Sequence, residues 1–331
     1  MKKTFATLLV AVVVGVGALA SMGFASRDMR ASQETGLPVD VTVQASQLPL
    51  DQIVAESPDG RRVRFEGGWA LTSDYGEFGG FSGIVVDNDA KSLVAISDKG
   101  DWWQAHFDAR GFVPPTAGTM QRFSLGATAD KIDLDAESLI RFGGGYLVSF
   151  EHNHRLEFVS EIGAIPSRPA LSDIDFSGIS GNGGMEAIAR LATGQLLAIA
   201  ERGLNGADQL KAWLVSPEVV QGLWFKPPAN FSPTDAAVMP NGDVLVLLRH
   251  FSAIDGVAIK VHHIKAEDIV PGAAFSGEEV LHLTPEFTVD NMEGLDVVAM
   301  DEDTVRLVMI SDDNFNPLQR TLLMMFDYDY R

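Results

Sequence analysis

Five copies of one short pattern recur along the chain. In each copy, a glycine- or acid-bearing turn leads into an apolar run, a turn, a second apolar run and then a charged residue. The copies start roughly 50 residues apart, which is the period of a four-stranded propeller blade. The repeat therefore predicts an all-β fold, a β-propeller of four-stranded blades. We count five blades, and six are possible if the early segment hides a degenerate copy.

The apolar runs fill most of the strands that such blades need. Gln195–Ala200 and Asp243–Leu248 are nearly continuous in apolar residues, as expected for strands buried on both faces. In the second copy the predicted strands are Glu137–Phe142, Tyr146–Phe150, Arg155–Ser160 and a weaker run near Ala164.

The fifth copy ends one strand short. Its last predicted strand is Thr321–Tyr328. A spare strand pattern, Arg62–Leu71, precedes the first copy, in the same position that Glu279–Leu283 has before the fifth copy. We infer that Arg62–Leu71 completes the last blade, so that one blade contains both ends of the propeller. This closure removes two free sheet edges.

The N-terminus has the features of a secretory signal. Lys2 and Lys3 precede the apolar stretch Leu8–Ala20, and small residues follow at Ala18-Leu19-Ala20 and Gly23-Phe24-Ala25. We therefore predict a signal peptide at 1–25, an N-terminal arm or linker at 26–60 and the propeller at 61–331. The predicted location is periplasmic or secreted, and an uncleaved anchor is the alternative. Because the chain has no cysteine, its stability must come from a core.

The formal net charge of the chain is −20. Such a surface repels nucleic acid and anionic membranes, so we expect neither nucleic-acid binding nor stable membrane insertion. It suits cations, although acidity can also serve solubility alone. We expect the chain to act as a monomer on a small-molecule substrate.

The repeat predicts two neighbouring rings of side chains at the central channel. The first-strand starts supply Ser82, Glu137, Glu186, Asp235 and Glu293. The second-strand ends supply Asp98, Glu151, Glu201, Arg249 and Asp312. Several carboxylates close together raise one another's pKa, and a bound cation, calcium before magnesium, relieves the repulsion. The alternative is structural, with each carboxylate accepting hydrogen bonds from backbone N–H groups of the next blade.

Basic residues accompany these acids. Lys99, Arg202 and Arg249 follow or replace the acids at the second-strand ends, where they either hold an anionic substrate group or only neutralise the carboxylates. His152-Asn153-His154 offers two imidazoles, but no third zinc ligand is evident from spacing. The chain has no G-x-S-x-G, H-E-x-x-H, Walker or dinucleotide-binding motif and no thiol. A metal-activated water is the hydrolytic route left most open.

Several motifs together resemble the phytase-like domain family ("esterase-like activity of phytase") of exported bacterial proteins. They are Gly79-Gly80-Phe81-Ser82-Gly83-Ile84 with Ala95-Ile96-Ser97-Asp98-Lys99-Gly100, Met185-Glu186-Ala187-Ile188-Ala189 with Ala198-Ile199-Ala200-Glu201-Arg202-Gly203, and Asn291-Met292-Glu293-Gly294-Leu295-Asp296 with Ile310-Ser311-Asp312-Asp313-Asn314-Phe315. The resemblance covers roughly residues 60 to 330 and implies a β-propeller. It supplies no agreed catalytic residues, and fold alone does not fix function.

These observations lead to a hypothesis of calcium-assisted hydrolysis of a phosphoester or other ester. Calcium is held by Glu137, Glu186 and Glu293, with Asp312 as a further ligand. The catalytic candidates are Asp98, Glu201, Arg202 and Arg249, with the arginines steadying the anionic group. The alternatives are a calcium lactonase of the same geometry, and a non-catalytic propeller that binds a ligand or protein while its carboxylates are purely structural.

Overall fold

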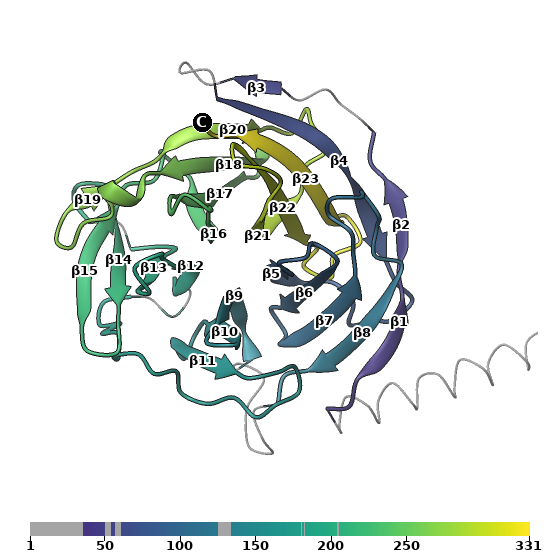
Figure 1. Ribbon diagram of the computed structural model, residues 1–331, viewed down its shortest axis with the longest axis horizontal. Helices are drawn as coiled ribbons and strands as arrows, with labels where there is room; N and C mark the ends of the chain where they lie inside the picture. Colours follow the sequence, from purple (N-terminus) through teal and green to yellow (C-terminus); the bar gives the residue numbers. More distant parts are fainter. Residues whose placement is uncertain are drawn as a thin grey trace, which may run out of the picture.

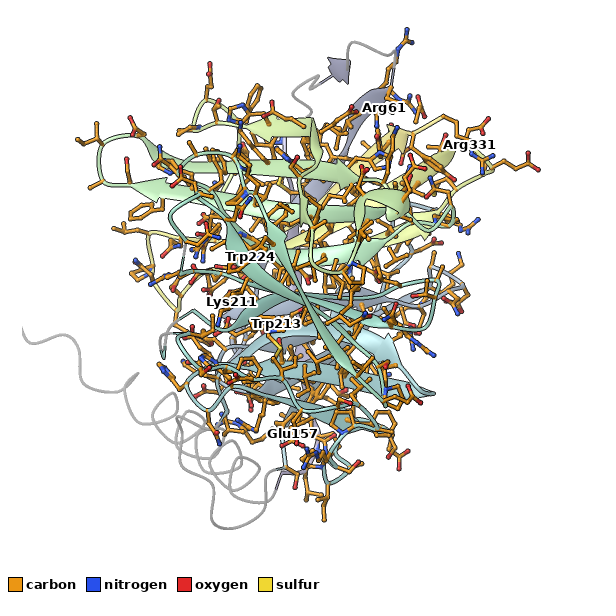
Figure 2. All side chains as sticks on the ribbon, turned by 90° about the vertical axis from the view of Figure 1, so that its left-hand side faces the viewer. Arg61, Glu157, Lys211, Trp213, Trp224 and Arg331 are labelled. Carbon is orange, nitrogen blue, oxygen red and sulfur yellow. The ribbon has the colours of Figure 1, made fainter. Side chains whose placement is uncertain are left out.

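Five small sheets surround a central channel in a computed structural model of the chain (Figure 1). The structure describes residues 36–49, 54–56, 61–124, 134–179, 181, 183–203 and 205–331. The predicted signal peptide lies outside these residues. Figure 2 shows the ring from its edge, with Lys211, Trp213 and Trp224 of the third blade toward the viewer. The propeller and its count of five blades are confirmed.

The blades follow one another along the chain, and each begins at the channel. Blade 1 contains β5 (Phe81–Val86), β6 (Ser92–Ser97), β7 (Asp101–His106) and β8 (Ala117–Arg122). Blade 2 contains β9 (Ala136–Phe142), β10 (Gly145–Phe150) and β11 (Arg155–Val159). Blade 3 contains β12 (Met185–Arg190), β13 (Leu196–Ala200), β14 (Leu210–Val215), β15 (Val220–Phe225) and the short parallel strand β19 (Ala274–Phe275).

The last two blades contain the longest strands. Blade 4 contains β16 (Ser232–Val238), β17 (Val244–Ser252), β18 (Gly256–Ile264) and β20 (Glu278–Leu283), with a 3₁₀ turn η2 (Ala266–Asp268) between β18 and β19. Blade 5 contains β21 (Asn291–Ala299), β22 (Thr304–Asp312), β23 (Thr321–Asp329) and β4 (Arg62–Thr72), and β3 (Val54–Glu56) pairs with β4. No helix among the described residues is long and apolar enough to cross a membrane.

Strand β4 closes the ring, as the sequence predicts. It pairs antiparallel with β23, with Trp69 opposite Leu323. Two strands of the N-terminal arm reinforce the join: β1 (Val39–Thr42) pairs with the outer edge of β8, and β2 (Gln44–Gln47) pairs with β4. The arm thus runs along the outside of blades 1 and 5 (Figure 1), and it covers sheet edges that would otherwise be exposed.

The prediction of a fourth strand near Ala164 is wrong. Blade 2 has three strands in the described part of the chain, and the segment after β11 makes only an isolated bridge between Phe158 and Ser167. Ala164 instead lies in a turn, where its N–H donates to the carbonyl of Glu161. The run Ile162-Gly163-Ala164-Ile165-Pro166 is too short between its glycine and its proline to add a ladder.

The blades pack face to face on apolar side chains, and the inner strands approach one another closely. β12 through Ala189, all of β13 and β17 through Leu248 are buried at every residue, which explains their nearly continuous apolar runs. At Gly294 in β21, an added Cβ would lie 2.7 Å from Ile310 Cγ2 and 3.0 Å from the backbone nitrogen of Ile84 in blade 1. Gly294 is thus required by the contact between blades 5 and 1.

This contact gives a stability prediction. Gly294→Ala should lower the free energy of unfolding by about 1–3 kcal/mol, because the backbone of the neighbouring blade cannot move aside without disturbing the ring. Gly222→Ala is the control, since an added Cβ at this β15 position meets nothing within 4 Å. Urea unfolding of both variants measures the difference. Equal stability of the two variants would contradict this account of the inner-strand contacts.

Candidate functional site

Each inner strand contains one β-bulge near its start. The register shifts leave one extra residue on each inner strand: Ser82, Glu137, Glu186, Thr234 and Glu293. A bulge leaves its extra residue outside the ladder and re-aims the side chain. Because every inner strand begins at the same end of the channel, the bulges bring their side chains to that end, which we call the carboxylate mouth.

The fourth copy departs from the predicted ring by one residue. Its bulged residue is Thr234, so Asp235 occupies the next position along β16 and does not join the ring at the mouth. Asp235 is buried and bridges the channel instead. It accepts hydrogen bonds from Ser138 Oγ of blade 2 at 2.8 Å, from the Leu295 N–H of blade 5 at 2.7 Å and from the Ala236 N–H at 2.9 Å.

Three glutamates meet at the carboxylate mouth. Glu137, Glu151 and Glu186 each offer an oxygen, and these oxygens all lie within 4.8 Å of one another. Burial, and then neighbouring carboxylates, raise the pKa of all three side chains; for Glu137 the largest carboxylate effect comes from Glu186. Arg249 opposes the rise at Glu186, and His152 opposes it at Glu151. Among the described residues, no lysine or arginine forms an ion pair with any of the three. We call them the glutamate triad.

His152 extends this group on the side of blade 2. Its Nε2 lies 3.1 Å from Asp135 Oδ2 and 3.9 Å from Glu151 Oε2, and the three residues form a second cluster of possible ligands within 4.8 Å. His152 has φ 57°, a left-handed conformation that is uncommon for a non-glycine residue. Sequence spacing did not reveal Asp135, because it approaches His152 only when β9 and β10 form their hairpin.

Arg249 links the other acids of the mouth. Its Nη1 lies 3.2 Å from Glu293 Oε1 and its Nη2 lies 3.8 Å from Glu201 Oε1, and it also donates to Asn291 Oδ1. Burial lowers the pKa of Arg249, but Glu293 and the other carboxylates raise it further, so the guanidinium stays charged. Burial raises the pKa of Glu293 to about 7, against the opposing effect of Arg249.

Arg202 extends from the same network toward solvent. Its Nε lies 2.6 Å from Glu201 Oε2, yet 58% of its side chain is exposed, compared with 5% for Glu201. One side of the guanidinium is therefore held by a buried carboxylate while the rest remains accessible. Such a group can bind an anion without being displaced from the site.

Asp98 and Asp312 stand together on the opposite side of the mouth. Burial, followed by Asp135, raises the pKa of Asp98 to about 6, and burial raises that of Asp312 to about 7. Asp98 Oδ1 is buried and has no hydrogen-bond partner among the described residues. Asp312 accepts from Asn291 Nδ2 at 3.2 Å and from the Asn314 N–H at 2.5 Å. Asp98 thus accepts a backbone hydrogen bond from Lys99 but keeps one carboxylate oxygen, Oδ1, without a partner in the described structure.

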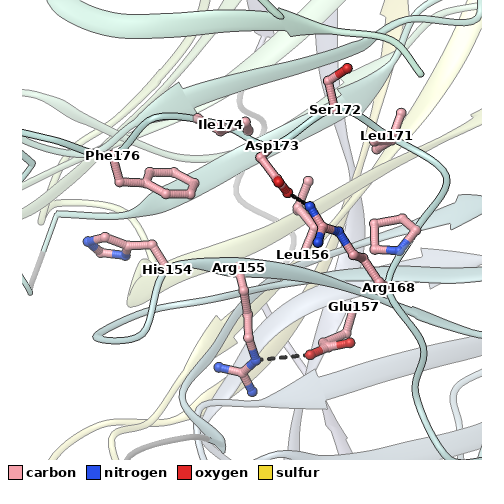
Figure 3. Close-up of a pocket in the computed structure, with 11 residues that line it drawn as sticks. His154, Arg155, Leu156, Glu157, Arg168, Leu171, Ser172, Asp173, Ile174 and Phe176 are labelled. Carbon is pink, nitrogen blue, oxygen red and sulfur yellow. Dashed lines mark hydrogen bonds and ion pairs between the residues drawn. The ribbon is translucent and has the colours of Figure 1, made fainter. Parts of the chain in front are cut away.

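Two cavities lie outside the channel. One of about 590 Å³ lies between blades 3 and 4 and includes Glu201 and Arg202 in its lining. The other, of about 380 Å³, lies beside β11 and the segment that follows it, where Arg168 pairs with Asp173 and Arg155 with Glu157 (Figure 3). The second cavity does not include the glutamate triad. Only the first therefore shares residues with the carboxylate mouth.

The comparison with known families agrees with this architecture. The model of the family described as "Phytase-like: Esterase-like activity of phytase" matches residues 76–315. The chain belongs to the phytase-like family. The matched region spans the first and second strands of all five blades, and so it contains every residue of the glutamate triad and its charged neighbours at the mouth.

Solved structures similar to this phytase-like chain share little sequence with it. A protein of unknown function from Dyadobacter fermentans has 11% identity and a TM-score of 0.45, covering 89% of this chain and 99% of its own. An endo-arabinase from Bacteroides thetaiotaomicron has 9% identity and a TM-score of 0.48, covering 75% of this chain and 94% of its own. No curated protein matches the chain.

The structure brings most of the predicted site residues together. Glu137, Glu186, Glu201, Glu293, Arg249 and Asp312 are connected at the mouth, each through an ion pair or charge interaction with at least one of the others, and Arg202 and Asp98 lie at its sides. Sequence reasoning missed Asn291, which joins Arg249 to Asp312, and it did not place Glu151 among the ligands. The repeat could have indicated both residues, because each lies at a strand end that faces the mouth. The roles of these residues stay predictions.

The raised pKa values predict an unusual pH dependence of stability. The folded-state pKa values of Asp98, Asp296, Glu293 and Asp312, about 6 to 7, exceed their ordinary values, so the folded chain binds more protons than the unfolded chain between about pH 4 and pH 7. Stability should therefore fall as the pH rises through this window. In chelator-treated protein, the melting temperature should be higher at pH 5 than at pH 8.

A matched pair of variants tests the source of this dependence. Glu186→Gln removes one buried ionisable group from the mouth and should reduce the loss of stability at pH 8, whereas exposed Glu302→Gln should leave it unchanged. A melting temperature that is constant or higher at pH 8 would show that the carboxylates do not repel one another as described.

Proposed function

We propose that this phytase-like protein is an exported hydrolase that cleaves a phosphoester or another ester with the help of a divalent cation, with calcium as the first choice. The observation that carries the proposal is the glutamate triad, three close carboxylates at one mouth of the channel that form no ion pair with a lysine or arginine among the described residues. Its repulsion makes the site costly to ionise unless a cation binds.

The triad fits calcium on donor type and on spacing. Calcium prefers carboxylate oxygens at about 2.3–2.6 Å, so oxygens on opposite sides of one ion lie about 5 Å apart. The three triad oxygens lie within 4.8 Å of one another, so one ion can reach all three; three carboxylates suit calcium better than magnesium, which usually takes only one or two. The proposed ligands are therefore Glu137, Glu186 and, in place of Glu293, Glu151, because Glu293 is paired with Arg249. When bound, such a cation polarises an ester oxygen and lowers the pKa of water.

The residues around the triad supply the remaining parts of a hydrolysis. The exposed side of Arg202 can hold an anionic phosphoryl or carboxylate oxygen, and Arg249 keeps Glu201 and Glu293 in place behind it. The oxygen of water forms a bond to the phosphorus or acyl carbon, and the bond to the ester oxygen breaks. To Asp98, whose Oδ1 has no hydrogen-bond partner among the described residues and whose pKa is raised, we assign the role of accepting the proton that water loses; this proton finally goes to the departing alcohol.

Hydrolysis assays with and without metal test this proposal. We expect the mature protein to hydrolyse at least one member of a panel (4-nitrophenyl phosphate, bis(4-nitrophenyl) phosphate, 4-nitrophenyl acetate, phytate and δ-valerolactone), to lose the activity in chelator and to regain it with calcium. Glu186→Gln should lower kcat/KM by about 10- to 100-fold, as loss of a ligand or its support does elsewhere. Glu302→Gln, on the exposed β21–β22 turn, should not.

Each contrary outcome has a definite meaning. Undiminished hydrolysis in chelator would remove the cation from the mechanism while leaving an esterase. Turnover of the lactone alone would identify the lactonase alternative. A folded protein that binds calcium but turns over no ester would favour the non-catalytic propeller, in which the mouth carboxylates are structural or hold a ligand.

A further inference from the structure

The cavity between blades 3 and 4 begins where the carboxylate mouth ends. Glu201 and Arg202 line it and also belong to the Arg249 network. Its volume of about 590 Å³ falls in the usual range for small-molecule sites, roughly 300–1,000 Å³. A substrate whose anionic group lies at Arg202 can therefore extend its remaining part into this cavity.

One wall of the cavity is a preformed apolar surface. It consists of Leu210, Pro227, Pro228 and Phe231. The two prolines restrict the backbone, and the Phe231 N–H donates to the Pro228 carbonyl at 3.1 Å, which closes a turn. Phe231 also packs against His250, with ring centroids 5.6 Å apart. A wall of this kind suits the face of a ring.

The same segment is fixed to the carboxylate side of blade 4. His250 Nδ1 lies 2.8 Å from the carbonyl oxygen of Asn230, and His250 directly follows Arg249 at the end of the ladder with β16. The backbone N–H of Lys226 donates to the Phe275 carbonyl of β19 at 2.8 Å. The cavity wall is thus tied at both ends to strands, so it requires little ordering when a ligand binds.

The charges around the cavity are few and mixed. Arg202 and Lys226 are positive, and Glu201 and Asp208 are negative. Glu201 is already paired with Arg202, whereas Lys226 is exposed and has no ion pair with an acid in the described parts of the chain. Lys226 can match one further negative charge. A heavily phosphorylated ring would instead bring several charges against Glu201 and Asp208.

We propose that the substrates are esters of a ring-containing, largely apolar alcohol that carries one additional anionic group. The ester's anionic group lies at Arg202, the ring lies on Pro227, Pro228 and Phe231, and the second anion pairs with Lys226. This inference rests on the proposed function, because it treats the cavity as the alcohol side of the hydrolytic site. It predicts selectivity for a singly charged ring over both neutral and polyanionic ones.

Binding of non-hydrolysable analogues tests the inference without turnover. In calcium-containing buffer, calorimetry should show that 4-(phosphonomethyl)benzoate binds about tenfold more tightly than benzylphosphonate, which lacks the carboxylate. Lys226→Met should abolish this difference and leave benzylphosphonate affinity unchanged. Lys265→Met removes another exposed lysine, next to β18 of blade 4 and outside the cavity, and should preserve the difference.

The outcomes separate this inference from the proposed function. Equal affinity of the two phosphonates, or equal losses in Lys226→Met and Lys265→Met, would overturn the assignment of the cavity even if esters are hydrolysed. Discrimination that depends on Lys226 without hydrolysis of any ester would support the cavity as a ligand site and overturn the proposed function. Hydrolysis of 4-carboxyphenyl phosphate in preference to phenyl phosphate, lost in Lys226→Met, would support both.

Discussion

Repulsion between buried carboxylates is the constraint on which the carboxylate mouth depends. Glu137, Glu151 and Glu186 are close enough to share one cation, and burial makes each of them expensive to ionise. Two other carboxylates of the mouth, Glu293 and Glu201, are instead neutralised by ion pairs with Arg249. The mouth therefore contains one half whose carboxylates pair with Arg249 and one half whose carboxylates form no ion pair with a lysine or arginine in the described structure, and we propose that the cation binds in the second half.

The geometry behind this arrangement is the bulge at the start of every inner strand. An extra residue on each strand moves Ser82, Thr234 and three glutamates out of their ladders and toward the channel. Just beyond the bulges the channel is bridged, since Asp235 of blade 4 accepts hydrogen bonds from blades 2 and 5. Asp235 therefore separates the mouth from the rest of the channel. On the side of blade 3, Glu201 and Arg202 connect the mouth to the cavity between blades 3 and 4.

The repeat predicted the propeller, its five blades and the closing strand, because each copy contains the same local pattern and a ring is the arrangement that pairs all of its edges. The repeat also placed most acids at one end of the channel, since strand starts and hairpin ends coincide there.

The repeat misplaced Asp235 by one residue, because no residue type identifies the position of a bulge and the register therefore cannot be predicted from the sequence. It overlooked the pairing of Asp135 with His152 and the link through Asn291, which exist only after strands distant in sequence come together. The incomplete blade 2 was missed because a short apolar run resembles a strand whether or not a partner edge is available.

The most direct test of this account is the position of a bound cation. Crystals of the mature protein grown with calcium, or with manganese as a stronger anomalous scatterer, should show one anomalous peak coordinated by oxygens of Glu137, Glu151 and Glu186. In Glu186→Gln crystals grown in the same solution, that peak should weaken or disappear. A mouth without a peak in well-ordered wild-type crystals would contradict the account, as would an ion coordinated elsewhere. The triad would then be a set of protonated carboxyl groups that hold the blades together.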